Sequence, residues 1–375
     1  MNCRIPARTG KPAPEGAGGF PMPFINEVLA HNQHLAGSAA PMRQSRFLFD
    51  PDQVMQLLRS RITGQDAALA SIGACLTLTK AELGDPRKPL AVMLLMGPTG
   101  VGKTETVRLL AEAIHGRADA LCRIDMNTLA QEHYAASLTG APPGYVGSKE
   151  GHTLFDQETI EGSFGKPGIV LFDELEKASE PVIRALMNIF DNGQLRLSSG
   201  TRTLDFRNSL IFMTSNVGTQ ALWTHEQQAL GAWRRWLPST WRERGERRRQ
   251  QQALEKAFAP EFLNRIDQRL IYRRLDDEQI LLLVELALER LNQRLARHQV
   301  RLLLSPTLKE WLGARGFDRR YGARAMARCF RQSLEPEIAG ALLQSPDRPV
   351  GCQLIADLDP QQQTIVVTLR HPDYG

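Results

Sequence analysis

Four short apolar runs stand out in the first regular part of the chain. Each is bounded by polar, proline or glycine residues and is only long enough for one strand. Largely apolar runs of this length are typical of strands buried on both faces of a parallel sheet. The predicted strands are Leu90–Met96, Ala120–Asp125, Gly168–Phe172 and Ser209–Thr214.

Amphipathic segments precede these runs and alternate with them. Asp50 is a favourable N-cap residue and Pro51 suits the first helical position, so a helix is predicted from there to about Arg61. Strands that alternate with helices predict an α/β domain with a mostly parallel sheet. The other helices predicted here are Gln65–Leu83, Thr104–His115 and Pro181–Asn192.

The C-terminal part follows another pattern. Apolar residues recur at helical spacing through Asp276–Gln299, which predicts a long amphipathic helix. Val350–Ile355 and Thr364–Leu369 predict a terminal hairpin around the turn at Asp359. A small, mainly helical second domain follows from this pattern, with further helices predicted at Gln252–Phe262, Ser305–Arg315 and Ala323–Leu343.

The composition is that of a globular protein with two or three domains. The chain has 375 residues, 42% hydrophobic and 23% charged, which excludes collagen, coiled coils and wholly disordered chains. We divide it into an arm at 1–45, a large α/β domain at 46–273 and a small lid domain at 274–375. The arm is rich in Pro, Gly and Ala and is predicted to be disordered. Its apolar island at Phe20–His31 either docks on a partner or packs on its own domain.

The net charge of +5 is concentrated in two segments. An insert at 219–252 carries seven Arg and three Glu, and the arm carries four basic and two acidic residues. The rest of the chain is close to neutral, which argues against a nucleic-acid motor. Four of the five Trp accompany the Arg residues of the insert. That combination occurs in protein interfaces, in proteins that bind single-stranded nucleic acid, and in solvated helices packed on a host domain.

Cysteine spacing and the N-terminus bear on the compartment. The five cysteines are widely spaced and show neither disulfide nor zinc-ligand spacing. No uncharged apolar run is long enough to span a membrane, and Pro and Gly interrupt the N-terminus where a secretory signal would have its apolar core. We expect a cytoplasmic protein without membrane insertion, although the acid-poor N-terminus leaves a transit peptide open.

A phosphate-binding motif follows the first predicted strand. Gly97-Pro98-Thr99-Gly100-Val101-Gly102-Lys103-Thr104 fits the pattern GxxxxGK[ST] and leads directly into a helix. Glycines let backbone N–H groups surround a phosphate, and the helix N-terminus adds positive potential. We expect Lys103 to reach the β- and γ-phosphates and the Thr104 hydroxyl to bind Mg²⁺.

Two carboxylates and one amide complete the candidate site. Asp173 and Glu174 end the apolar run Ile169–Phe172, at the sheet edge where α/β proteins bind ligands. We expect Asp173 to hold Mg²⁺ and Glu174 to activate the attacking water. Asn216 ends another strand and could contact that water or the γ-phosphate if its strand lies between the other two. Glu176 is expected to cap the next helix.

Taken together, these motifs resemble the AAA+ ATPases of the Clp type, in particular the second ATPase module of ClpB and ClpA with its small domain. The resemblance covers about Phe47–Leu369. It implies a P-loop AAA+ parallel sheet flanked by helices, followed by a small, mainly helical α+β lid domain. Further matching motifs are Ile62–Gln65, Gly140–Gly147, Asp205–Asn216, Pro260–Asp267 and Gly322–Arg324.

The resemblance implies roles for single residues in these motifs. Ile62 and Gln65 would contact adenine. Arg265 would serve as an arginine finger on ATP held by a neighbouring subunit, and Arg324 would sense the γ-phosphate from the lid domain. ATP and Mg²⁺ are the implied cofactors, and a ring of identical subunits, usually a hexamer, is the implied assembly.

A central pore loop is implied at Gly140–Gly147. There Tyr145, beside Val146, would grip a protein substrate, whereas a tyrosine buried in a turn is the structural alternative. Leu230-Gly231-Ala232 lies where relatives that serve a peptidase carry an apolar-Gly-apolar anchor, and Ala is a poor anchor, so peptidase docking is not expected. An unknown adaptor could bind at 20–31 or at 219–252.

The sequence therefore favours an ATP-hydrolysing ring that threads or pulls protein substrates. Two alternatives stay open. One is an AAA+ ATPase that acts on nucleic acid through its basic insert, and the other is a nucleotide-gated scaffold or regulator.

Overall fold

The computed structural model describes residues 45–129, 155–196, 203–217, 251–317, 323–345, 349, 351–359, 361 and 364–370. The arm, the predicted pore loop with Tyr145 and Val146, and almost all of the 219–252 insert lie outside the described residues. Predictions about these three segments therefore stay predictions.

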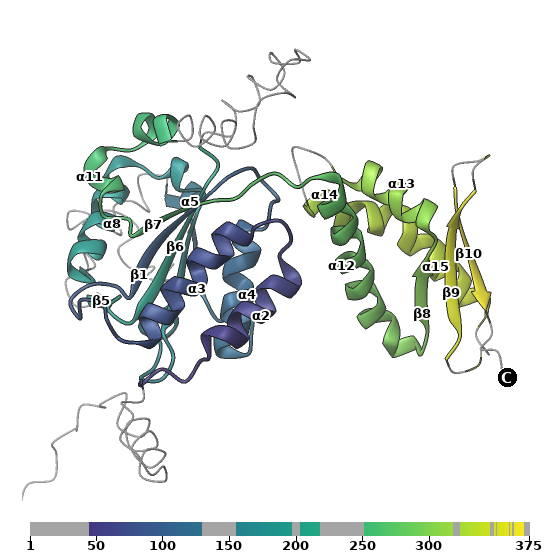
Figure 1. The fold of residues 1–375 in the computed structure, drawn as a ribbon, viewed down its shortest axis with the longest axis horizontal. Coiled ribbons are helices and arrows are strands. Elements are labelled where there is room, and N and C mark those ends of the chain that lie inside the picture. Colours follow the sequence, from purple (N-terminus) through teal and green to yellow (C-terminus); the bar gives the residue numbers. More distant parts are fainter. Residues whose placement is uncertain are drawn as a thin grey trace, which may run out of the picture. The chain divides into compact units, whose positions relative to one another are not determined.

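A five-stranded parallel sheet forms the centre of the large domain (Figure 1). The strand order is β2-β3-β6-β1-β7, so β6 lies between β1 and β3. The sequence-based fold class is confirmed, and the strand that leads to Asn216 has the position its expected role requires. The strands are β1 (Ala91–Met96), β2 (Cys122–Asp125), β3 (Gly168–Asp173), β6 (Ser209–Ser215) and β7 (Gln268–Ile271).

Helices cover both faces of this sheet. Along β1, Val92 and Leu94 belong to one buried core, whereas Met93 and Leu95 belong to the other. A strand buried on both faces needs apolar residues at every position, which explains its unbroken apolar run. One core includes α2 (Pro51–Arg61), α3 (Asp66–Lys80) and α4 (Lys103–His115), and the other includes α5 (Met126–Leu129), α7 (Gln157–Glu161), α8 (Glu180–Asn192) and α11 (Pro260–Leu263).

The start of α2 forms as the sequence predicts. The Asp50 carboxylate accepts a hydrogen bond from the Asp52 backbone N–H, and Pro51 occupies the first turn. The helix buries Val54 and Leu58 against its domain. Capping and burial together fix the first element of the described chain.

Three details of the large domain differ from the prediction. Residues 251–257 are helical, but the chain then leaves the helix and starts α11 at Pro260, so one helix over Gln252–Phe262 was wrong. Proline lacks an N–H and clashes with the preceding turn, which breaks the helix there. The fifth strand, β7, was not predicted, and neither was the small hairpin of β4 (Gln194–Arg196) and β5 (Thr203–Asp205).

The small domain is an α+β unit with its own core. Its sheet has the order β10-β9-β8, with β9 and β10 antiparallel and β8 parallel to β9. Its elements are α12 (Asp277–Leu295), the 3₁₀ turn η3 (Ala296–His298), β8 (Arg301–Leu304), α13 (Pro306–Gly316), α14 (Ala323–Cys329), the π-helical turn η4 (Phe330–Leu334), α15 (Glu335–Gln344), β9 (Gln353–Leu358) and β10 (Ile365–Arg370).

Two corrections concern this domain. The predicted hairpin exists but is part of a three-stranded sheet, because Arg301–Leu304 pairs with β9. The predicted helix over Ala323–Leu343 is interrupted by the π-helical turn.

In the part of the chain that the structure describes, no helix has the length and apolarity needed to cross a membrane. The side chains of Cys75 and Cys352 are buried and form no disulfide, as expected of structural thiols.

Candidate active site

A cavity of about 810 Å³ adjoins the phosphate-binding motif. Ten of the expected site residues line it: Ile62, Thr99, Gly100, Val101, Gly102, Lys103, Thr104, Asp173, Glu174 and Asn216. Residues of the small domain, from α12, α14, η4 and α15, line it as well. The cavity thus brings the sequence-predicted phosphate and acid residues together with the small domain.

The loop between β1 and α4 has the backbone shape of a phosphate cradle. Gly97, Gly100 and Gly102 all have positive φ angles, of 143°, 75° and 103°. At Gly97, a Cβ atom would lie 2.4 Å from the Tyr272 carbonyl oxygen, so no other residue fits. α4 begins directly after Gly102, and its first N–H groups have no partners within the helix. Free N–H groups at a helix N-terminus are suited to bind an anion.

The Lys103 ammonium lies inside this loop, and the residue is only 7% exposed. It donates to the carbonyl oxygens of Gly97 and Pro98 at 2.6 and 2.7 Å, and to Asn216 Oδ1 at 2.9 Å. These contacts hold the Lys103 ammonium within the loop and link the loop to the residue that follows β6. Gly97 and Pro98, both predicted to bind the cofactor, contribute carbonyl oxygens to Lys103 and do not line the cavity.

Asp173 lies at the centre of the acidic part of the site. Its Oδ1 accepts from the Thr214 hydroxyl and is 3.4 Å from Thr104 Oγ1. Its Oδ2 accepts from Arg123, at 2.6 Å from Nη2 and 3.1 Å from Nε. Thr214 and Arg123 were not predicted as site residues; they come from β6 and β2, which flank β3 in the sheet.

The donor chemistry at Thr104 and Asp173 suits Mg²⁺. A hydroxyl oxygen and a carboxylate oxygen are hard ligands, which this ion prefers, and it usually keeps several waters and phosphate oxygens as its other ligands. The two oxygen atoms face each other across one short gap. The residues present therefore fit the magnesium ion that the sequence predicts.

Glu174 follows Asp173 in a strained backbone conformation. Its φ and ψ of 60° and 53° lie in the left-handed region, which is uncommon for a residue with a side chain. Its N–H donates to Thr214 Oγ1 at 3.0 Å, and its carboxylate accepts from the Asn127 amide at 2.6 Å. The sharp turn directs Glu174 away from the strand line and into the cavity wall.

Glu176 has a different role from the helix cap that we expected. It lies in the 3₁₀ turn η1 (Leu175–Lys177), and both of its carboxylate oxygens accept from the Asn216 N–H at 3.2 Å. The contact anchors the end of β6 beside the turn after β3. The next helix, α8, begins at Glu180 after Ser179 instead.

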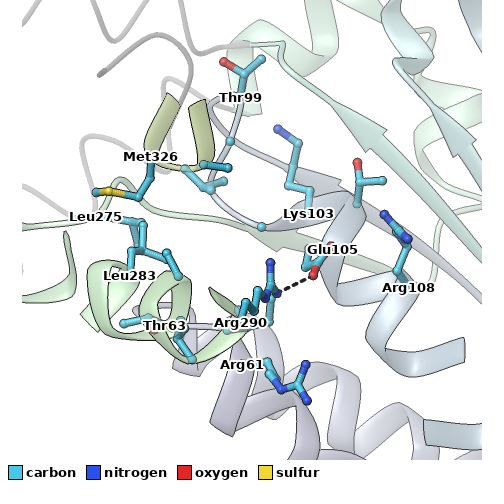
Figure 2. A pocket seen from close by; sticks show the side chains of 18 of the residues that line it. Arg61, Thr63, Thr99, Lys103, Glu105, Arg108, Leu275, Leu283, Arg290 and Met326 are labelled. Carbon is cyan, nitrogen blue, oxygen red and sulfur yellow. Dashed lines mark hydrogen bonds and ion pairs between the residues drawn. The ribbon is translucent and has the colours of Figure 1, made fainter. Parts of the chain in front are cut away.

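Part of the remaining wall of the cavity is apolar and comes from both domains. Figure 2 shows Leu275, Leu283 and Met326 on one side and Lys103 and Glu105 on the other. An apolar wall opposite a phosphate loop is suited to the flat base of a nucleotide. Other apolar lining residues are Ile62, Val101, Leu286, Ala287 and Phe330.

An ion pair joins the two domains at this cavity. Arg290 of α12 donates to Glu105 of α4 at 2.8 Å (Figure 2). Glu105 directly follows Thr104, so the small domain contacts the helix that starts at the phosphate loop. This pair could not be predicted from local sequence, because its partners are far apart in the chain.

Three expected residues lie elsewhere or are only partly described. Gln65 is 2% exposed and does not line the cavity; its amide bonds the Arg273 backbone at 2.8 and 2.9 Å. Arg265 pairs with Asp191 at 2.7 Å and does not line the cavity. Arg324 belongs to the first turn of α14, and its side chain lies outside the described part of the chain.

Comparison with known proteins gives matches along most of the chain. The family described as AAA domain (Cdc48 subfamily) matches residues 88–269, and the C-terminal, D2-small domain of ClpB protein matches residues 275–353. A Pseudomonas aeruginosa protein named ATP-dependent protease ATP-binding subunit-like protein AmiB is 51% identical, over 85% of this chain and 86% of its own length.

Two further relatives differ in how much of them is matched. A Rhodococcus erythropolis protein named ATP-dependent protease ATP-binding subunit-like protein is 44% identical, over 89% of this chain and 95% of its own length. Chaperone protein ClpB2, chloroplastic, of Oryza sativa subsp. japonica is 38% identical over 76% of this chain, which is only 28% of that relative.

The fold and the cavity define a P-loop nucleotide-binding protein whose small domain contributes to the site. With these matches, the chain belongs to the Clp-type AAA+ ATPases, a family of chaperones and unfoldases. It binds nucleotide and hydrolyses ATP to ADP and phosphate. Members of this family typically form hexameric rings that act on protein substrates.

Proposed function

We propose that this chain assembles into a ring, usually of six copies, that uses ATP hydrolysis to pull on protein substrates and remodel them. The observation that carries the proposal is that the phosphate loop, two acids and the small domain together line one cavity. A site shared by two domains can convert nucleotide turnover into movement between them.

The chemistry proposed for the cavity follows from its groups. Lys103 and the loop N–H groups hold the β- and γ-phosphates, and Ile62 packs beside the base. Glu174 accepts a proton from the attacking water. The water oxygen forms a bond to the γ-phosphorus while the bond between the γ-phosphorus and the ADP oxygen breaks. Asn216 orients that water. Mg²⁺, when bound by Thr104 and Asp173, neutralises charge on the phosphate oxygens.

Two arginines are proposed to act on the γ-phosphate, one from a neighbouring subunit and one from the small domain. Arg265 is one-third exposed and is held by Asp191, so it is available at the surface for a neighbouring subunit's nucleotide. Arg324 would report on the γ-phosphate from α14, whose Met326 and Ala327 line the cavity. An arginine supplied in trans stabilises transition-state charge and couples neighbouring sites.

Gln65 is proposed to support the base pocket indirectly. Its amide is occupied by the Arg273 backbone on both sides, two residues before the cavity-lining Leu275. It therefore shapes the wall next to the base through the main chain, while Ile62 lines the cavity itself. We further propose a cytoplasmic location, for which the buried thiols of Cys75 and Cys352, which form no disulfide, are suited.

The Glu174→Gln variant tests the enzymatic half of the proposal. It is expected to bind ATP and assemble but to lose turnover by about 100-fold or more, the usual contribution of a general base. Glu180→Gln is the matched control, because Glu180 only pairs with Arg184 on the exposed face of α8. Full turnover in Glu174→Gln would remove Glu174 as the base.

Affinity capture with the same variant tests the substrate half. With ATP bound and hydrolysis blocked, protein substrates should stay attached. Adding Tyr145→Ala should release them, whereas Tyr145→Phe should retain them, because the proposed grip needs a large aromatic side chain. Salt-dependent binding of DNA or RNA that disappears on deletion of 219–252, with no captured protein, would instead support the nucleic-acid alternative.

A further inference from the structure

A buried tyrosine contacts the helix that carries the phosphate loop. Tyr272, the first residue after β7, is 1% exposed, and its hydroxyl donates to Thr106 Oγ1 at 3.0 Å. Thr106 is fully buried, and its hydroxyl donates to the Gly102 carbonyl oxygen at 2.8 Å. The three groups form one chain of hydrogen bonds beneath the loop.

The direction of this chain is fixed. A carbonyl oxygen only accepts, so the single Thr106 hydroxyl proton must point to Gly102. Thr106 Oγ1 is then left as an acceptor, which requires Tyr272 to donate. Burial raises the pKa of the Tyr272 hydroxyl, so its proton stays in place at any physiological pH.

The Gly102 carbonyl belongs to the last peptide bond of the loop. It accepts from both the backbone N–H and the hydroxyl of Thr106, each at 2.8 Å. In a trans peptide the C=O and the following N–H point in opposite directions. Two bonds on the carbonyl therefore also fix the direction of the Lys103 N–H, the first N–H of α4 at the phosphate loop.

Tyr272 also begins the segment that connects the two domains. Its N–H donates to the Met96 carbonyl, the residue before the loop, at 2.7 Å. The next residue, Arg273, is held by Gln65 through both of its backbone groups. Leu275 then lines the cavity, and Asp276 caps α12. The five residues Tyr272–Asp276 thus connect a contact with the phosphate loop to the start of the small domain.

We propose that Tyr272 is a positioning residue for nucleotide binding, which acts through Thr106 on the Gly102–Lys103 peptide and ties the phosphate loop to the interdomain segment. The inference rests on the proposed phosphate role of Gly97–Thr104. It adds a second group of residues, behind the loop, to those that face the nucleotide.

Substitutions in the full chain separate this role from general stability. Tyr272→Phe removes only the hydroxyl and should weaken ADP binding about 3- to 10-fold, the usual effect of one lost hydrogen bond. AMP lacks the β-phosphate and should bind with unchanged affinity. Thr106→Val should weaken ADP binding more than Tyr272→Phe does, and Thr106→Ser, which keeps the hydroxyl, should restore it.

The double variant provides the decisive comparison. If Tyr272 acts through Thr106, adding Tyr272→Phe to Thr106→Val should not weaken ADP binding further. Thr77→Val is the matched control, because Thr77 makes the same hydroxyl bond one helical turn back, to Gly73 on α3, at 3.0 Å. An equal loss in both backgrounds, or normal ADP affinity in a folded Tyr272→Phe protein, overturns the proposal.

One more variant separates this proposal from the one it rests on. Lys103→Ala should abolish ADP binding if the loop holds phosphate. If Lys103→Ala binds ADP normally, the proposed phosphate site fails. If only the Tyr272 result fails, the phosphate site stands without this positioning residue.

Discussion

The Asn127 amide donates a 2.6 Å hydrogen bond to the carboxylate of Glu174. The same amide donates to Asp125 Oδ1 at 3.0 Å, so the side chain is fixed between two acids. β2 and β3 pair in register with Asp125 opposite Asp173, which brings the ends of the two strands together. This bond occupies an acceptor site of the Glu174 carboxylate and holds the side chain in one direction.

We expect Asn127→Ala to raise basal ATP hydrolysis, because it frees Glu174 from this bond. A rise of about 3- to 10-fold corresponds to part of the energy of one hydrogen bond to a charged group. Phosphate release at saturating ATP measures it. Asn127→Ala combined with Glu174→Gln should show no turnover, and a fall in activity in Asn127→Ala alone would mean that Asn127 orients the base for catalysis.

The sequence predicted the residues that lie next to each other in a motif and missed those that meet only in the folded sheet. Lys103, Asp173 and Asn216 each end or follow an apolar run, which is a local signal. Arg123 and Thr214 reach Asp173 only because β2 and β6 flank β3. Strand order is not written in local periodicity, so these partners could not be found.

Other differences arise from interactions that the local pattern does not contain. β8 looks like part of a loop until its pairing with β9 is known. Glu176 looks like a helix cap because an acid before a helix is common there. In the fold it faces the Asn216 N–H, which comes from another strand. Tertiary partners determine such roles, and local preferences do not.

The Arg290–Glu105 pair gives a test of lid closure. Both side chains are partly exposed, at 53% and 35%, so the pair contributes at most about 1 kcal/mol. Arg290→Glu places two acids in contact and should weaken ADP binding about 2- to 5-fold, mostly at low salt. Titration with ADP at low and high salt measures this effect.

Two variants control for that result. Arg290→Glu combined with Glu105→Arg restores opposite charges and should recover affinity. Lys309→Glu reverses the charge of the Lys309–Glu285 pair, which has similar exposure but lies within the small domain. If Lys309→Glu weakens ADP binding as much as Arg290→Glu does, the effect is general electrostatics and not lid closure.

His115 makes the stability of the large domain depend on pH. Burial lowers the pKa of this imidazole, and Lys166 and Arg117 lower it further, although the Pro167 carbonyl, which accepts from Nε2 at 2.9 Å, partly opposes the shift. The unfolded chain therefore binds more protons than the folded chain, and stability rises with pH in this range. The stabilisation is complete above the unfolded value of about 6.5 and is lost as the pH falls toward the folded value.

We expect the urea concentration at the unfolding midpoint to decrease when the pH is lowered from about 7.5 to about 5.5. The decrease should be smaller in His115→Gln, because Gln keeps a donor without titrating. The exposed His298 of η3 is the matched control, and His298→Gln should keep the wild-type pH dependence. An identical fall in His115→Gln would show that other groups cause it.

Gly168 should tolerate no side chain, because α7 packs directly on the start of β3. A Cβ atom there would lie 1.9 Å from the Ile160 carbonyl oxygen and 2.8 Å from that of Thr159. Ile160 cannot easily move, since its carbonyl also accepts from Ser209 Oγ at 2.5 Å. We expect Gly168→Ala to lower the free energy of unfolding by about 3 kcal/mol, as overpacking against backbone does.

Gly84 provides the control, because a Cβ atom added there would have no atom within 4 Å. In urea denaturation, the free energy of unfolding of Gly84→Ala should stay within about 0.5 kcal/mol of wild type. If Gly168→Ala is as stable as Gly84→Ala, then α7 can shift away from the sheet, and the strand that delivers Asp173 and Glu174 is less rigidly supported than its contacts imply.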